Sequence, residues 1–172
     1  MKHLFKVAVP LSIASILSYG EWEILTVFAA HLGPAEVAAW ALLGFLWEIF
    51  EAATEAIGES AEVRVGYHLG KGDTAMARMS ANKTLFVGTC FAIAMTTVLY
   101  YMGDSLAIWL TDDIMIQHMI KESIPYMSLG NVTMTYGMLC WYIAVSQGRY
   151  RLSTTLAFLT SWGIMMPAAA LM

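Results

Sequence analysis

The sequence predicts an all-α membrane protein, a polytopic helical bundle that crosses the bilayer about five times. Two observations predict this class. Hydrophobic residues make up 59% of the chain and charged residues only 13%, whereas soluble domains carry about 25% charged residues. The apolar residues also recur in stretches of roughly 20, the length that one helix needs to cross the hydrocarbon layer. The 172 residues leave room for about four to six crossings and predict a single membrane domain over 1–172.

Turn residues separate the expected helices. The first helix covers about 5–31 and ends before Gly33 and Pro34, which disfavour its continuation. Its basic start and apolar run are like a signal peptide, but no small-residue cleavage site follows, so we interpret it as the first span. The second helix covers about 35–65. The other expected elements are a polar cytoplasmic loop at 66–83 and spans at 84–101, 121–146 and 152–172. The last span is still apolar where the sequence stops, as if the chain were cut inside a helix.

The basic residues predict how these spans are oriented. If the spans alternate in direction, eight of the nine basic residues fall on one side of the membrane and only Lys121 falls on the other. Cytoplasmic loops carry the excess of lysine and arginine, so we expect a cytoplasmic N-terminus. The sequence does not distinguish the plasma membrane from a vacuolar or other organelle membrane. The eight residues are Lys2, Lys6, Arg64, Lys71, Arg78, Lys83, Arg149 and Arg151.

An acidic stripe runs along the second expected helix. It consists of Glu48, Glu51, Glu55, Glu59 and Glu62. At about 100° per residue these side chains fall within an arc of about 80°. A charge at the centre of a membrane helix costs on the order of 3 kcal/mol, so the stripe is not expected to face lipid. Like charges at this spacing repel, and in a low-dielectric setting they take up protons or bind a cation.

Two interpretations of the acidic stripe remain open. In the first, it belongs to a proton-coupled or cation-binding pathway, with Glu48 and Glu51 as coupling carboxylates and with Glu55 and Glu59 lining a substrate cavity. In the second, the helix from about Glu55 onward extends beyond the bilayer into water. The second interpretation leaves Glu48 and Glu51 unexplained.

The first helix also carries a polar face. Small hydroxyl residues at such spacing often serve as plain helix contacts, but an intramembrane carboxylate is functional by default, so Glu23 is the first candidate for coupling. Glu21 points about 160–200° away from Glu23 and is expected to meet another helix or a different pocket. Tyr19 and Trp22 could supply aromatic contacts to a cationic substrate. The residues on the face are Ser12, Ser15, Tyr19, Glu23 and Thr26.

Other classes of function find no support in the sequence. No Gly-x-Ser-x-Gly or HExxH motif is present, so an enzyme is not expected. The glycines at 66–72 follow a helix and lack a GK[ST] ending, which argues against a nucleotide-binding loop. No basic patch is interleaved with aromatic residues, so nucleic acid is not an expected partner. Cys90 and Cys140 are interpreted as buried thiols, and we expect no metal or cofactor besides a transported proton or sodium ion.

One segment resembles a known family. The stretch EVRVGYHLGKGDTAMAR is similar to the loop motif of the multidrug and toxic compound extrusion (MATE) transporters, and the match is closest to the second six-helix half of that family. The segments VAVPLSIAS, EWEILTV, SQGRYR and GIMMPAAALM also resemble that half, so the likeness covers nearly the whole chain. The matching loop residues are Arg64, Val65, Gly66, Leu69, Gly70, Gly72 and Asp73.

The resemblance implies part of a twelve-helix antiporter whose two halves alternate access around a central cleft. It would export xenobiotics or organic cations in exchange for protons, with sodium as the alternative coupling ion. Its partners would be the bilayer, the substrate and the remaining half. Glu23 matches a carboxylate linked to coupling in that family. Some relatives have a second glutamate at the position of Ser18. Glu55, Glu59 and Glu62 have no counterpart in the usual family pattern, which has small or apolar residues there. The alternative hypothesis is a non-transporting membrane subunit, a remnant of a half-transporter.

Overall fold

The computed structural model describes residues 2–170, and no strand occurs in that range. The prediction of an all-α bundle is confirmed. The side chains of residues 1–7, 10, 11, 14, 15, 17–19, 168 and 170–172 lie outside the described part. The helices are α1 (Lys2–Leu32), α2 (Pro34–Gly70), α3 (Thr74–Leu110), α4 (Ile114–Ser146), α5 (Tyr150–Thr160), the π-helical turn η1 (Ser161–Met165) and α6 (Met166–Ala170). The last three follow without a break and form one continuous helical segment.

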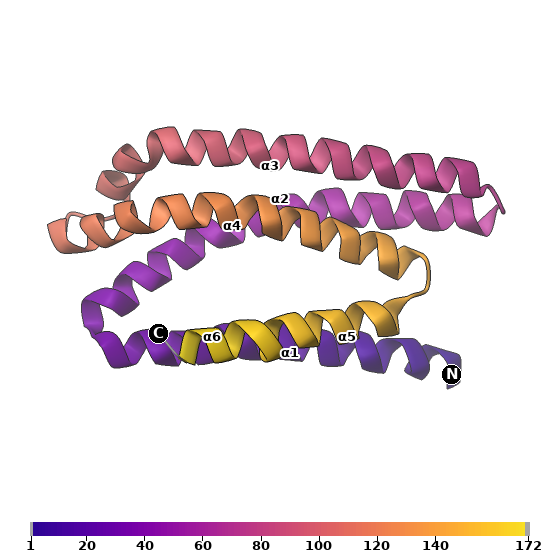
Figure 1. Ribbon diagram of the computed structural model, residues 1–172, viewed down its shortest axis with the longest axis horizontal. Coiled ribbons are helices and arrows are strands. Elements are labelled where there is room, and N and C mark those ends of the chain that lie inside the picture. Colours follow the sequence, from indigo (N-terminus) through magenta and orange to yellow (C-terminus); the bar gives the residue numbers. More distant parts are fainter. Residues whose placement is uncertain (1, 171–172) are drawn as a thin grey trace.

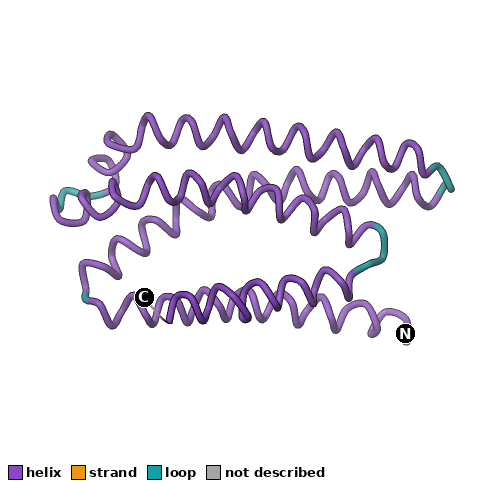
Figure 2. The backbone as a smooth tube through the Cα atoms, in the orientation of Figure 1, coloured by secondary structure: helices purple, strands orange, loops and turns teal. Residues whose placement is uncertain are grey.

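The helices form two groups (Figure 1). Helices α2, α3 and α4 pack against one another, while α1 packs against α5, η1 and α6. Helix α2 leaves α1 at the short turn around Gly33 and crosses into the three-helix group, and the loop after α4 leads back to α5. The connections therefore alternate between the two ends of the bundle, as Figure 2 shows. This alternation is what the assignment of basic residues to one side requires.

The two ends differ in charge. The end with the α2–α3 and α4–α5 connections, which we name the basic end, carries Lys71, Arg78 and Arg149 among others. The opposite end carries Asp104 and Lys121, the one basic residue that the sequence analysis assigned to this side. The ammonium of Lys121 lies 3.1 Å from the carboxylate of Asp104, so its charge is paired locally.

Small residues allow the three-helix group to pack closely. The ring of Tyr142 in α4 lies against Gly58 of α2, and the side chain of Leu139 lies against Gly88 of α3. A Cβ at either glycine would overlap these side chains, which is the usual reason for small residues between membrane helices. The apolar core cluster lies nearer the opposite end and consists of Phe50, Leu99, Ala107, Ile120 and Ile124.

Buried polar side chains also link these helices. The amide of Asn131 in α4 donates to the hydroxyl of Thr96 in α3 over 3.0 Å, and the Thr96 hydroxyl donates to the carbonyl of Ser128 over 3.1 Å. The hydroxyls of Thr54 in α2 and Thr135 in α4 lie 3.1 Å apart. Such bonds contribute about 0.6 kcal/mol each between membrane helices, so they guide the register more than they determine stability.

The predicted loop at 66–83 is wrong for most of its length. Helix α2 continues to Gly70 and α3 begins at Thr74. The turn needs only three residues because Gly72 adopts a φ of 76°, and because Asp73 accepts a hydrogen bond from the backbone amide of Met76 over 3.0 Å. The polar residues that follow include several good helix formers, so they mark contact with water rather than a break in the helix.

Two other predicted spans are shorter than the helices that contain them. The predicted span at 84–101 lies inside α3, which extends from Thr74 to Leu110, and the predicted span at 121–146 begins at Ile114. Asp113 accepts hydrogen bonds from the amides of Met115 and Ile116 and so caps α4 before its amphipathic first turns. Apolar length predicts the part of a helix in the hydrocarbon layer, whereas capping residues fix its true ends.

Among the described residues, α2 and α3 are long and apolar enough to cross a membrane. Each has 37 residues, which corresponds to about 55 Å at 1.5 Å per residue, compared with about 30 Å for the hydrocarbon core. Both helices therefore extend well beyond the hydrocarbon layer.

Candidate functional site

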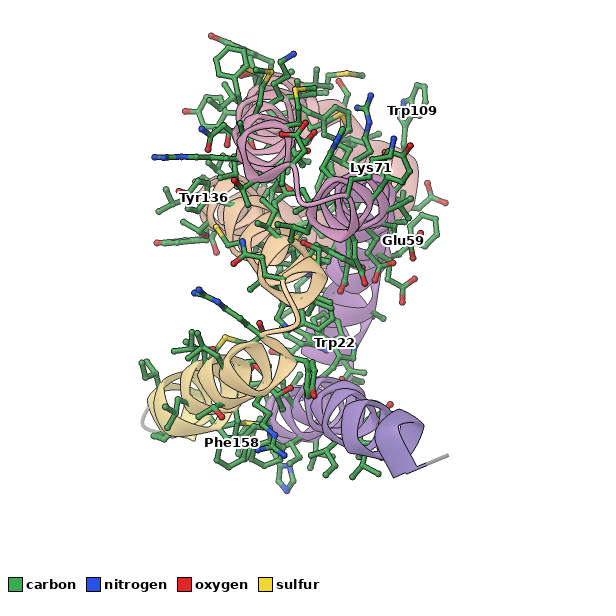
Figure 3. All side chains as sticks on the ribbon, turned by 90° about the vertical axis from the view of Figure 1, so that its right-hand side faces the viewer. Trp22, Glu59, Lys71, Trp109, Tyr136 and Phe158 are labelled. Atoms are coloured by element: carbon green, nitrogen blue, oxygen red, sulfur yellow. The ribbon has the colours of Figure 1, made fainter. Side chains whose placement is uncertain are left out.

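The acidic stripe lies beside the packed seam of α2. The seam consists of Phe50, Thr54, Gly58, Ala61 and Val65, which are buried. At about 100° per residue the stripe is centred roughly 100° from this seam, so it flanks the contact with α4. Figure 3 shows Glu59 on the side of α2 that is turned away from α3. Glu48, Glu55 and Glu59 are exposed, and Glu51 and Glu62 are half-buried.

The stripe has no cationic partner in the described part of the chain, where the ion pairs involve other acidic residues. Arg64, two residues after the stripe, is exposed and forms no ion pair among the described side chains. The repulsion between the neighbouring carboxylates is therefore not balanced by protein cations there. In a low-dielectric setting such repulsion favours proton uptake or binding of a cation.

The antiparallel packing of α2 and α3 indicates the depth of the stripe. The two helices are joined by the three-residue turn around Gly72, so each residue of α3 lies nearly level with the residue of α2 at equal distance from that turn. The uncharged run of α3, residues 84–101, is therefore level with residues 43–60 of α2. A run without charges is the part of a helix that best fits the hydrocarbon layer. Four of the five carboxylates of the stripe lie at the depth of this uncharged run: Glu48, Glu51, Glu55 and Glu59.

This comparison favours the first of the two interpretations of the stripe. The second required α2 to leave the bilayer from about Glu55 onward. If it did so, the uncharged residues of α3 beside Glu55 and Glu59 would also leave the bilayer, at the cost of exposing apolar side chains to water. Only Glu62 and the residues after it are level with the charged first turns of α3.

Tyr142 joins α4 to the acidic stripe. Its ring is buried against Gly58 of α2, and its phenol interacts electrostatically with four of the five carboxylates. These are Glu55, Glu59, Glu62 and Glu51. Sequence reasoning missed Tyr142 because a single tyrosine in an apolar run gives no periodic signal. Its part in the site follows only from the packing of α2 on α4.

Trp22 lies in the contact between α1 and α2. Its ring stacks on Trp40 at 4.7 Å between centroids and also touches Gly44. The indole nitrogen of Trp40 donates to the hydroxyl of Thr26 over 3.0 Å, which fixes the stacked pair against α1. Figure 3 shows Trp22 between the two helix groups, apart from Glu59. The side chain of Tyr19, the other predicted aromatic contact, lies outside the described residues.

The two glutamates of α1 have different surroundings. Glu23 is exposed, whereas Glu21 is only 7% exposed. One carboxylate oxygen of Glu21 is buried and has no hydrogen-bond partner among the described atoms. The neighbouring Gly20 lies beside Trp162 of η1, and Trp22 packs on α2. Glu21 thus lies between these two contacts, as expected for a side chain that points away from Glu23.

The glycine-rich motif covers the last turns of α2 and the short turn at the basic end. Gly72 has the left-handed backbone conformation of the turn, and Asp73 caps α3. The positions that a Cβ would occupy at Gly66 and Gly70 have no described neighbour within 4 Å. The motif therefore ends in a tight turn, and much of its surface is uncovered by the described chain.

The expectation that both cysteines are buried is wrong. Cys90 and Cys140 are free thiols and both are exposed. An exposed side chain in an apolar run is common on a membrane helix, because the lipid face is apolar as well as the packed face. Among the described residues, no group of three or more histidine, cysteine or acidic side chains gathers as a metal site would require.

Comparisons with known proteins identify transporters that are similar in sequence to this chain. The chain is 21% identical over 169 residues to an uncharacterized transporter of Schizosaccharomyces pombe, covering 98% of this chain and 31% of the relative. It is 24% identical over 127 residues to the human Multidrug and toxin extrusion protein 1, covering 74% of this chain and 22% of the relative. It is 23% identical over 116 residues to the Multidrug resistance protein MdtK of Edwardsiella ictaluri, covering 67% of this chain and 25% of the relative.

The chain thus spans between about a fifth and a third of the length of these relatives. No solved structure matches it. The model of the MatE family matches residues 10–171, nearly the whole chain. Together with the helical fold and the glycine-rich turn, this match shows that the chain belongs to the MATE family of integral membrane transporters.

Proposed function

We propose that this chain is part of a secondary active antiporter that exports organic cations or other drug-like compounds in exchange for protons, with sodium as the less favoured coupling ion. The proposal rests on the row of carboxylates that lies at the level of the uncharged run of α3 and has no cationic partner in the described part of the chain. Support also comes from the relatives whose names refer to multidrug extrusion or resistance.

The chemistry of antiport follows from competition for the same carboxylates. A cationic substrate and a proton each neutralise a carboxylate in a low-dielectric setting, and both cannot do so at once. Binding of a proton from outside therefore displaces the cation, and release of the proton inside restores the charge that attracts the next cation. The remaining helices of the protein would supply the alternating access that such exchange needs.

The proposal gives each candidate residue a role. Glu23 carries the coupling proton, and Glu48 and Glu51 bind the cation or pass the proton along α2. Two more carboxylates, Glu55 and Glu59, line the substrate cavity. Tyr19 and Trp22 provide aromatic surface for a cation, with Trp22 held in place by its stack on Trp40.

Replacement of Glu23 by glutamine tests this proposal. The full-length protein is reconstituted in vesicles, and uptake of radiolabelled tetraethylammonium is driven by a pH gradient or, in parallel, by a sodium gradient. We expect Glu23→Gln to abolish pH-driven uptake, because an amide cannot carry the proton. The control is Glu122→Gln, since Glu122 is exposed near the opposite end and faces His118. Unchanged uptake and unchanged pH dependence in Glu23→Gln would exclude the role of Glu23.

The rival hypothesis of a non-transporting subunit is separated by a different measurement. An immunoblot of the native membrane, with an antibody against the segment GYHLGKGDTAMAR, reports the length of the mature polypeptide. A band near 19.0 kDa, the mass of this chain, would favour the subunit. A band several times larger would favour the antiporter.

A further inference from the structure

A pocket lies at the basic end of the three-helix group, outside the acidic stripe. It has a volume of about 560 Å³ and lies between the last turns of α2, the first turns of α3 and the end of α4. A second, more open hollow of about 840 Å³ on the surface of α3 shares Thr74, Arg78 and Asn82 with it. The lining of the pocket includes Arg78, Arg149, Asn82, Gln147, Leu85 and Cys140.

The polar lining of the pocket favours an anion. Arg78 comes from α3 and Arg149 from the connection after α4, so two separate elements bring a guanidinium to the same pocket. Neither arginine forms an ion pair with any described side chain, and no acidic residue lines either hollow. Asn82 and Gln147 add neutral hydrogen-bond donors. Guanidinium groups bind phosphate oxygens in a forked geometry, which suits this arrangement.

Apart from Thr74, and Lys83 in the adjoining hollow, the rest of the lining is apolar and continues onto an exposed helix surface. Leu85 lines the pocket, and Phe86 and Val87 line the adjoining hollow. Phe86 is 72% exposed and Val87 is 56% exposed in the described chain. These three residues begin the uncharged run of α3, so the arginines lie at the level where a lipid headgroup would be and the apolar residues at the level of its acyl chains.

We propose that the pocket binds the headgroup of an acidic phospholipid from the leaflet at the basic end, with an acyl chain along α3 at Phe86 and Val87. A free phosphate would need only the arginines, whereas the apolar surface beside them fits the chain of a lipid. The bound headgroup would contact α3 and the α4–α5 connection together. It would therefore tie the three-helix group to the connection that leads to α5.

Lipid retention by the purified full-length protein tests the charge requirement. Native mass spectrometry compares phosphatidylglycerol with phosphatidylcholine on the wild-type protein, Arg78→Gln, Arg149→Gln and the control Lys121→Gln. Lys121 is the basic residue at the opposite end, where it pairs with Asp104. We expect each arginine variant to retain phosphatidylglycerol about fivefold less well, and phosphatidylcholine and the control to be unaffected. Equal losses in the control, or none in the arginine variants, would overturn the proposal.

The native thiols provide a second readout without any change in charge. Cys140 lines the pocket, whereas the exposed Cys90 lies outside both hollows. In nanodiscs, phosphatidylglycerol is expected to slow labelling of Cys140 by N-ethylmaleimide relative to phosphatidylcholine. Cys90 lies at the level of the hydrocarbon layer and is expected to stay unlabelled in both lipids. Equal rates of Cys140 labelling in the two lipids would overturn the proposal. Equal protection by inorganic phosphate in phosphatidylcholine would also overturn it, because the pocket would then be a site for a soluble anion.

Discussion

Glu21 and Glu23 lie two residues apart in α1, and the fold gives them opposite surroundings. Glu23 is exposed in the described chain. Glu21 is buried, with one carboxylate oxygen that lacks a hydrogen-bond partner among the described atoms. A π-helical turn faces this part of α1, and such turns occur frequently at functional sites. Glu21, to which the sequence analysis gave no role in coupling, is therefore the more constrained of the two.

We predict that Glu21→Gln stabilises the full-length protein by about 1 kcal/mol, because an amide avoids the cost of burying a carboxylate whose oxygen has no partner. Thermal unfolding in detergent at neutral pH measures the difference. Glu23→Gln is the matched control, and we expect no change there because Glu23 is exposed. A lower unfolding temperature for Glu21→Gln alone would mean that the carboxylate has a stabilising partner.

Gly58 decides how closely α2 and α4 approach. A Cβ at this position would overlap the ring of Tyr142, which is the residue that links α4 to the acidic stripe. We predict that Gly58→Leu destabilises the protein by about 2 kcal/mol through overpacking and also lowers transport, because the ring is displaced from the carboxylates. Thermal unfolding and vesicle uptake measure the two effects.

Gly66→Leu is the control for this helix. Gly66 lies two turns further along α2, and no described atom lies within 4 Å of the position of its Cβ. Leucine has a higher helix propensity than glycine at both positions, by about 1 kcal/mol or less, so the difference between the variants isolates the contact with Tyr142. Equal stability of the two variants would show that α2 and α4 do not pack as described.

Among the elements, hydrophobic patterning predicted about five helices, and the described range holds five continuous helical segments. It placed the start of α3 at residue 84, whereas the helix begins at Thr74, because polarity reports contact with water and not the backbone conformation. Asp73 is the signal that could have corrected the boundary, since aspartate before a run of helix formers is a typical N-cap. Tyr142 had no such signal, because its contact with Gly58 joins residues far apart in the sequence.

For the whole molecule, the separation of charge between the two ends could be predicted from the sequence, because the connections of antiparallel helices must alternate. The exposure of Cys90 and Cys140 could not. An apolar neighbourhood indicates burial in a soluble protein, but on a membrane helix it is shared by the packed face and the lipid face. Depth in the bilayer likewise follows only when α2 and α3 are compared residue by residue.

That comparison leads to a prediction about water. Cys90 of α3 lies nearly level with Glu55 of α2, and both side chains are exposed in the described chain. We predict that a small cationic thiosulfonate reagent labels Glu55→Cys in a Cys140→Ser background of the full-length protein, whereas Cys90 at the same depth stays unlabelled. A thiol reacts as the thiolate, which forms in water and not in lipid. An excess of an organic cation should slow the reaction at residue 55.

Each outcome bears on the position of α2. Labelling of Cys90 at the same rate as residue 55 would mean that this level of the bundle lies outside the hydrocarbon layer, and the acidic stripe would then be a solvated surface. No labelling at either position would mean that water does not reach the stripe, and antiport through these carboxylates would fail for lack of a path. Labelling of residue 55 alone requires an aqueous cavity inside the membrane, and a row of carboxylates without protein cations is what such a cavity needs to hold a cation.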